Sequence, residues 1–261
     1  MRSAQQFAKA GLVWPGGGLF FWWQAGAATG LAKTMDLSAT PLVGASAGSL
    51  AATLAACSVN MDVALESAVR RSHEQGVFAK GPWGLYGIWG PIIHDWLDEL
   101  LPEDADERCN GRVGIIVREL SSTSGVQQRT ISEFTSRPDL IAACLASAHV
   151  PLFLDGHPTA TYRNVSCVDG SLTFWGLPNV RYALPRGFAG VPSVHISPFL
   201  DPRMRSRYGR PTDFLRLEGE SAVREMMTLG ESFVDDGGLV ELQEILEDSA
   251  TDRVTDRYGH A

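Results

Sequence analysis

Cysteine is scarce in this sequence. Four cysteines occur among 261 residues, at positions 57, 109, 144 and 167, and no two of them have the C-x-x-C spacing typical of zinc sites and redox-active thiols. We therefore expect reduced thiols in the protein core and neither a disulfide framework nor a metal site. Nothing in the sequence indicates a cofactor.

Positive charge is also in short supply. Lysine and arginine number 22 against 30 aspartates and glutamates, which gives a net charge of −8, and no basic run occurs. This balance argues against a nucleic-acid partner. The chain is 44% hydrophobic and 20% charged, as in an ordinary soluble globule, and is long enough for one α/β domain with a short tail.

One stretch, residues 11–32, contains no charge at all. A secretory signal or a membrane span is one interpretation, since the length suffices. Pro15 and the three glycines after it would break a helix near its middle, however. We favour a strand, a glycine loop and a buried helix, and expect the segment to be retained in a cytoplasmic protein.

The order of apolar runs and turn residues predicts an α/β fold. Strand and helix patterns alternate, which indicates a layered sheet with helices on both faces. The predicted strands are 11–14, 40–44, 111–120, 125–132, one within 162–168, and 192–199. The predicted helices are 19–34, 47–57, 61–74, 91–101 and 139–150.

A G-x-S-x-G motif lies between a predicted strand and a predicted helix, with Ser46 at its centre. This context is typical of a nucleophile elbow, a sharp turn that exposes the serine. Such a turn leaves no room for side chains two residues either side, which explains Gly44 and Gly48. The alternative is a turn of small residues with a buried hydroxyl group.

Two further features fit a serine nucleophile. Gly16, Gly17 and Gly18 lie between a strand and a helix, where backbone N–H groups can face an oxyanion. A phosphate-binding loop is the rival interpretation, but no Lys-Ser/Thr pair follows it. The second feature is Asp169 in an Asp-Gly turn after a strand, although such turns are common in their own right.

A Ser-His-Asp triad is a further possibility, with His149, His157 or His195 as the base. An α/β-hydrolase, however, places several strands before its elbow, whereas one or two precede Ser46. We expect His149 to cap or pack at a helix end and His195 to lie in the core.

Taken together, the glycine loop, G-x-S-x-G and the distant Asp-Gly resemble the patatin-like phospholipase family. The resemblance covers residues 11–200 and is greatest to the adiponutrin and adipose triglyceride lipase branch. It implies a three-layer α/β sandwich with a mostly parallel sheet. We expect a catalytic domain over 8–200, a helical extension over 201–247, and a polar, disordered tail over 248–261.

The resemblance also implies roles for individual residues. Ser46 matches the nucleophile and Asp169 its base, with no histidine. Gly16, Gly17 and Gly18 match the oxyanion loop, to which the N–H of Ala47 is a candidate addition. The chain departs from the family pattern at Phe21, where the family has glycine, and at Ser171, the residue after Asp-Gly. Phe21 falls inside a predicted helix, so we expect it to alter packing without touching the oxyanion donors.

The implied activity is hydrolysis of fatty-acyl esters of glycerolipids, triacylglycerol or phospholipid, through an acyl-enzyme. Transfer of the acyl group to another alcohol is the alternative, as is a catalytically weak lipid-binding regulator. We expect peripheral association with membranes or lipid droplets. The uncharged aromatic stretch 81–90 is either an apolar lid carrying Trp83 and Trp89 or a loop packed on the core.

Overall fold

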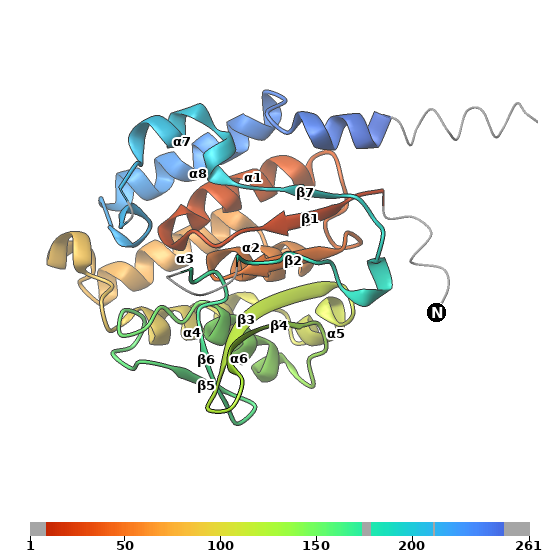
Figure 1. Cartoon of the computed structure of the whole chain (residues 1–261). Coiled ribbons are helices and arrows are strands. Elements are labelled where there is room, and N and C mark those ends of the chain that lie inside the picture. The colour runs from red at the N-terminus through yellow and green to blue at the C-terminus, as the bar shows by residue number, and fades with distance from the viewer. Residues whose placement is uncertain (1–8, 174–178, 211, 248–261) are drawn as a thin grey trace, which may run out of the picture.

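Short, wholly apolar strands form the centre of the fold. The computed structural model describes residues 9–173, 179–210 and 212–247 (Figure 1). Strands β1 (Gly11–Trp14) and β2 (Leu42–Ala45) are buried at every position and pair in parallel. Continuous apolar runs of this kind are typical of parallel strands covered on both faces.

The long strand β3 (Val113–Ser121) organises the rest of the sheet, whose order is β5-β6-β3-β2-β1-β7. β2 runs parallel to the first half of β3, and β6 (Val165–Val168) runs antiparallel to its second half. β4 (Gly125–Ile131) pairs along most of β3 and so occupies its other edge. β5 (Ala160–Tyr162) and β7 (Ser193–His195) end the sheet.

A layer of helices packs on one face of this sheet. The main core joins Leu12 and Trp14 of β1 to apolar side chains from the surrounding helices. These are α1 (Phe21–Ala32), α2 (Ala47–Ala56), α3 (Met61–Glu74), α4 (Trp89–Leu100), α5 (Ala105–Cys109), α6 (Arg137–Ser147), α7 (Pro202–Arg207) and α8 (Glu220–Asp235). Short 3-10 turns, η1 (Gly18–Phe20), η2 (Phe78–Trp83), η3 (Arg186–Phe188), η4 (Pro198–Leu200) and η5 (Asp213–Leu215), connect them.

The other side chains of the central strands form a second, smaller cluster. Val13, Val43 and Ile116 pack there against Val180, Tyr182 and Leu184. The sequence predicts helices on both faces, whereas at these positions the covering chain is the irregular segment 179–185. The predicted α/β sandwich with a largely parallel central sheet is confirmed.

The charge-free stretch 11–32 forms β1, a glycine turn and α1, as predicted. Its helix is buried on nearly all sides, and within the described part of the chain no helix combines the length and apolar character needed to cross a membrane. Several predicted boundaries are wrong. The strand predicted over 192–199 ends at His195, the helix predicted over 139–150 runs from Arg137 to Ser147, and the helix predicted from 91 begins at Trp89.

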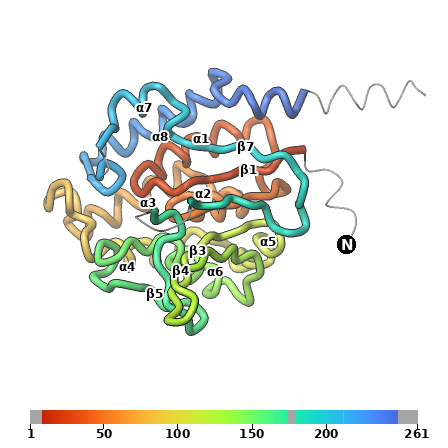
Figure 2. Tube along the Cα trace, in the orientation of Figure 1, coloured from red at the N-terminus to blue at the C-terminus, as the bar shows by residue number. Residues whose placement is uncertain are grey.

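Residues 201–247 are largely helical, with α7, α8 and a helix over 240–247. α8 lies along α1 (Figures 1 and 2). Glycines allow the two backbones to touch: a Cβ at Gly26 would lie 1.8 Å from the carbonyl oxygen of Met227, and one at Gly230 would lie 1.9 Å from that of Trp23. The predicted tail, 248–261, lies outside the described residues.

This contact makes Gly230 a test of the α1–α8 packing. Gly230→Ala should lower the free energy of unfolding by about 1–3 kcal/mol, because overpacking outweighs the gain in helix propensity. Gly209→Ala is the matched control, since a Cβ there meets nothing within 4 Å. Urea unfolding of both variants measures the difference, and equal stability would contradict the close contact.

Candidate active site

Ser46 occupies the turn between β2 and α2 in a conformation rarely adopted by residues other than glycine. Its φ is 53° and its ψ is −131°, which is a strained backbone for serine. The two flanking glycines allow the turn to close. A Cβ at Gly44 would lie 2.3 Å from the carbonyl oxygen of Gly48, and one at Gly48 would lie 2.0 Å from that of Trp14. The chain thus has the strand, sharp turn and helix expected of a nucleophile elbow.

Asp169 reaches Ser46 because β2 and β6 end at the same point along β3. In the register, Ala45 pairs with Ile116 from one direction and Val168 pairs with Arg118 from the other. Ser46 directly follows the last residue of β2, and Asp169 directly follows the last residue of β6. Ser46 Oγ donates a hydrogen bond of 2.5 Å to Asp169 Oδ2, across 123 residues of sequence.

Ser147, at the end of α6, holds this meeting point together. The backbone N–H of Ser46 donates to Ser147 Oγ at 2.9 Å, and Ser147 Oγ donates to the carbonyl oxygen of Ile116 at 2.6 Å. Two residues later, the carbonyl oxygen of His149 accepts from the backbone N–H of Asp169 at 2.8 Å. The sequence analysis missed Ser147, because a serine in an apolar helix carries no local signal of this role.

The carboxylate of Asp169 is buried, and both of its oxygens accept hydrogen bonds. Its Oδ1 accepts from both the backbone N–H and the hydroxyl of Ser171, at 2.8 and 2.7 Å. Burial raises the pKa of Asp169, while the hydrogen bonds from Ser46 and Ser171 act in the opposite direction. A carboxylate in this state is a stronger base towards a hydroxyl group than an exposed one.

The glycine loop lies against this pair. A Cβ at Gly16 would lie 3.1 Å from Ser46 Cβ and 2.2 Å from Ser171 Oγ. The N–H of Gly16 donates to the hydroxyl oxygen of Tyr182 at 3.4 Å. Only glycine therefore allows the loop to approach Ser46 this closely.

Three other N–H groups near Ser46 are candidates to bind an oxyanion. Gly18 has a φ of +52°, which turns the loop into η1, and Ala47 is the first residue of α2. Across the described residues, no intramolecular acceptor takes the N–H of Gly17, Gly18 or Ala47. Donors without partners, beside a helix N-terminus, suit a developing negative charge.

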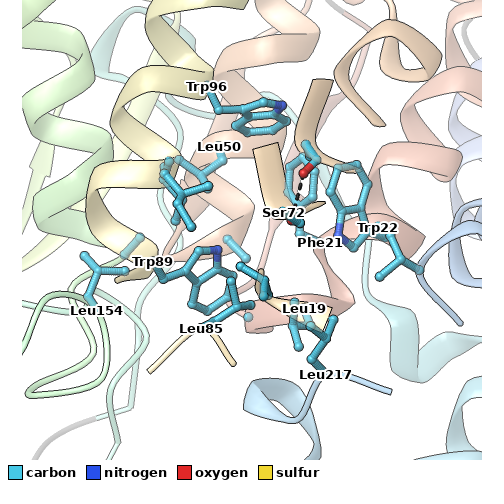
Figure 3. Close-up of a pocket in the computed structure, with 18 of the residues that line it drawn as sticks. Leu19, Phe21, Trp22, Leu50, Ser72, Leu85, Trp89, Trp96, Leu154 and Leu217 are labelled. Atoms are coloured by element: carbon cyan, nitrogen blue, oxygen red, sulfur yellow. Dashed lines mark hydrogen bonds between the residues drawn. The ribbon is translucent and has the colours of Figure 1, made fainter. Parts of the chain in front are cut away.

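Ser46 opens onto an apolar pocket between α1, α2, α3 and α4 (Figure 3). Among the described residues, only Ser46 and Ser72 bring hydroxyl groups to the lining. Ser72 Oγ donates within its own helix to the carbonyl oxygen of Ala68. No charged side chain is among the described residues that line it. The lining comprises Gly18, Leu19, Phe21, Trp22, Ser46, Ala47, Leu50, Ala68, Val69, Ser72, Val77, Phe78, Leu85, Trp89, Ile92, Ile93, Trp96, Ala148, Val150, Leu154, Leu217 and Val223.

The model of the patatin-like phospholipase family matches residues 12–174 of this chain. The chain belongs to this family. The matched segment runs from β1 beyond Asp169, so it contains the elbow, the glycine loop and the Asp-Gly turn. The resemblance inferred from the sequence is confirmed.

Individual relatives include transferases as well as proteins named as phospholipases. Human omega-hydroxyceramide transacylase is 32% identical over 60% of this chain and 30% of its own length. Mouse patatin-like phospholipase domain-containing protein 2 is 32% identical over 52% of the chain and 27% of its own length. Mouse 1-acylglycerol-3-phosphate O-acyltransferase Pnpla3 is 29% identical over 50% of the chain and 30% of its own length. The match spans less than a third of each relative.

No side chain of a described histidine in this patatin-like chain hydrogen-bonds to Ser46 or Asp169. His149 is buried, as expected of a packing residue, and its Nε2 lies 3.1 Å from the carbonyl oxygen of His157. His157 is exposed. The expectation that His195 lies in the core is wrong, because its side chain points out from the sheet-edge strand β7 and is exposed. The arrangement thus fits a Ser-Asp pair better than a triad.

The two tryptophans of the predicted lid lie in different environments. Trp83 is 51% exposed, whereas Trp89 is half-buried and lines the pocket. Both rings contact Phe153, at centroid distances of 6.3 and 5.8 Å. The side chain of Trp83 is therefore available at the protein surface, whereas Trp89 can contact a ligand in the pocket.

The buried carboxylate leads to a pH prediction. Asp169→Asn should lower ester hydrolysis by about 10²–10⁴-fold, because an amide cannot accept the serine proton. In the wild type, activity should be lost as pH falls through the raised pKa of Asp169, hence at a higher pH than for an exposed aspartate. A pH–rate profile of kcat/KM checks this.

The same residue allows a stability control. A raised folded-state pKa means that the charged carboxylate costs stability above that pKa. The cost shrinks as pH falls below the folded-state pKa and is gone below the pKa of the unfolded chain. The neutral, isosteric Asp169→Asn should therefore have a Tm equal to or above that of the wild type at pH 7. Full activity of the Asn variant, with loss in His149→Ala, would reject the Ser-Asp pair.

The split environment of the aromatic stretch leads to a second prediction. Trp83→Ser should weaken binding to phosphatidylcholine vesicles by about 10–100-fold, since burying such a side chain in lipid contributes roughly 1.5–3 kcal/mol. It should preserve Tm and hydrolysis of a short soluble ester. Trp89→Ser should impair both vesicle binding and hydrolysis of the short ester. Vesicle sedimentation and a short-ester assay measure these effects, and a large drop in Tm for Trp83→Ser would identify it as core.

Proposed function

We propose that this protein is a serine acyl hydrolase that cleaves fatty-acyl esters of glycerolipids, triacylglycerol or phospholipid, through a Ser46–Asp169 dyad. The observation that supports this most directly is the 2.5 Å hydrogen bond from Ser46 Oγ to Asp169 Oδ2 beside an uncharged, apolar pocket. Membership of the patatin-like family agrees with chemistry on lipid esters.

In the proposed mechanism, Asp169 Oδ2 takes the proton of Ser46 as Oγ attacks the ester carbonyl carbon. The N–H groups of Gly17, Gly18 and Ala47 then hold the oxyanion of the tetrahedral intermediate. One such donor is typically worth about 2.7–4 kcal/mol. The protonated Asp169 returns its proton to the leaving alcohol, which gives the acyl-enzyme. Asp169 then takes a proton from a water molecule that attacks the acyl carbonyl carbon. It returns this proton to Ser46 Oγ as the bond from Oγ to the acyl group breaks and the fatty acid leaves.

The substrate class follows from the pocket. Apolar and aromatic side chains surround the space next to Ser46, so the hydrocarbon part of an ester fits there. The polar part of the ester then lies outside this apolar lining. We infer that the protein acts in the cytoplasm at a membrane or lipid-droplet surface, which it contacts peripherally.

Acyl transfer is the second candidate function. Two of the relatives are named as a transacylase and an O-acyltransferase. The same acyl-enzyme would serve both reactions, and the outcome depends on whether water or a lipid hydroxyl reaches it first. A catalytically weak lipid-binding regulator is a third candidate, but the intact Ser46–Asp169 pair favours an enzyme.

Labelling with an alkyl fluorophosphonate tests the proposal. The wild type should be labelled at Ser46, and Ser46→Ala should lose the label and at least 99% of ester hydrolysis at unchanged Tm. Ser49→Ala is a matched control, because Ser49 lies one turn further along α2 and its hydroxyl donates to the carbonyl oxygen of Ser46. Labelling elsewhere, or none, would reject the nucleophile.

Adding an acyl acceptor then separates hydrolysis from transfer. With monoacylglycerol present, a hydrolase should still release mainly free fatty acid from a radiolabelled ester, whereas a transacylase should form diacylglycerol. A protein that binds lipid but gives neither product would be the regulator.

A further inference from the structure

The start of α1 gives the pocket an aromatic wall. Phe21 and Trp22, the first two residues of α1, both line the pocket, and Trp96 of α4 lies against them (Figure 3). The three rings meet edge to face, with centroid distances of 4.9 Å for Phe21–Trp22, 5.5 Å for Phe21–Trp96 and 6.1 Å for Trp22–Trp96. We refer to these three residues as the aromatic wall.

The wall is held firmly in place. Each of its side chains is buried. The indole N–H of Trp96 donates to the carbonyl oxygen of Ala64 in α3 at 2.8 Å, which fixes the orientation of that ring. Because edge-to-face contacts are directional, one ring cannot turn without disturbing the others. A ligand pressing on the wall therefore meets a rigid surface.

The wall is connected to the proposed catalytic residues by continuous lining. Gly18 and Leu19 line the pocket together with Ser46, and Phe21 lines it two residues further along the chain. From the opposite side, Leu50 extends the lining one turn along α2 from Ser46 (Figure 3). A hydrocarbon chain bound from Ser46 thus occupies a space that Phe21 bounds.

We propose that Phe21 limits the length of the acyl chain that this pocket admits. This inference rests on the proposed function, which makes a fatty-acyl chain the ligand. What it states physically is how long a chain the binding site can hold. Phe21 lines the pocket and contacts both tryptophans of the wall, so removal of its ring should open extra space at this end of the pocket. Each added methylene that fits an apolar pocket improves discrimination about tenfold or more.

The experiment measures binding in a Ser46→Ala background, where turnover cannot interfere. Saturated fatty acids of 8 to 18 carbons displace the fluorescent fatty acid cis-parinaric acid from the protein. In the Phe21→Ala variant, the affinity ratio of hexadecanoic to octanoic acid should rise at least about tenfold relative to the parent. Phe21→Leu should give a smaller shift in the same direction and serves if the alanine variant does not fold.

Phe20 provides the matched control. It neighbours Phe21 and is equally buried, but its ring packs against Phe199 and Tyr208, at centroid distances of 5.7 and 4.9 Å, and does not line the pocket. Phe20→Ala and Phe20→Leu should leave the affinity ratio unchanged. An equal shift in the Phe20 variants would show a general loosening of the core and would overturn the inference.

Turnover separates this inference from the proposed function. Esters of the same acyl lengths are assayed with Ser46 intact, and the preferred length should shift in the Phe21 variants as it does in binding. A shift in binding without any Ser46-dependent hydrolysis would reject the proposed function and retain the inference. An unchanged ratio in folded Phe21 variants, or no fatty-acid binding by the parent, would reject the inference.

Discussion

The candidate site depends on the end-to-end meeting of two strands on one edge of β3. β4 occupies the other edge, so β2 and β6 share the remaining one, where β2 runs parallel and β6 antiparallel. Their last residues therefore converge, and Ser46 and Asp169 fall level with Val117. A one-residue slip of either strand would turn its side chain to the other face of the sheet and break the pair.

Close backbone contacts, made by glycines that have no side chain, allow the two strand ends to meet. A Cβ at Gly170 would lie 1.9 Å from the carbonyl oxygen of Ile116, just as one at Gly48 would clash with Trp14. These contacts fix β1, β2 and β3 relative to the two turns. They also hold Ser46 at a positive φ, a strain that the surrounding structure must outweigh. The site is therefore as rigid as the sheet that supports it.

Polar and apolar functions are separated around Ser46. The sheet side provides the buried Asp169 carboxylate with its hydrogen-bond donors, whereas the helix side provides a pocket with an aromatic wall and no charged lining residue among those described. This division matches an ester, whose reacting carbonyl is polar and whose acyl chain is not. It also explains the aromatic-rich composition of α1 and α4, whose rings both fill the core and shape the pocket.

The sequence alone determined the local features: the elbow around Ser46, the glycine loop, the Asp-Gly turn and the α/β order of the chain. Each depends on residues within about ten positions, where turn geometry and periodicity leave few choices. Only the tertiary structure decided which distant groups meet. Ser147 and Ser171 joined the site, His195 proved exposed, and Phe21 became part of the pocket, because each outcome depends on sheet register and helix packing rather than on neighbouring residues.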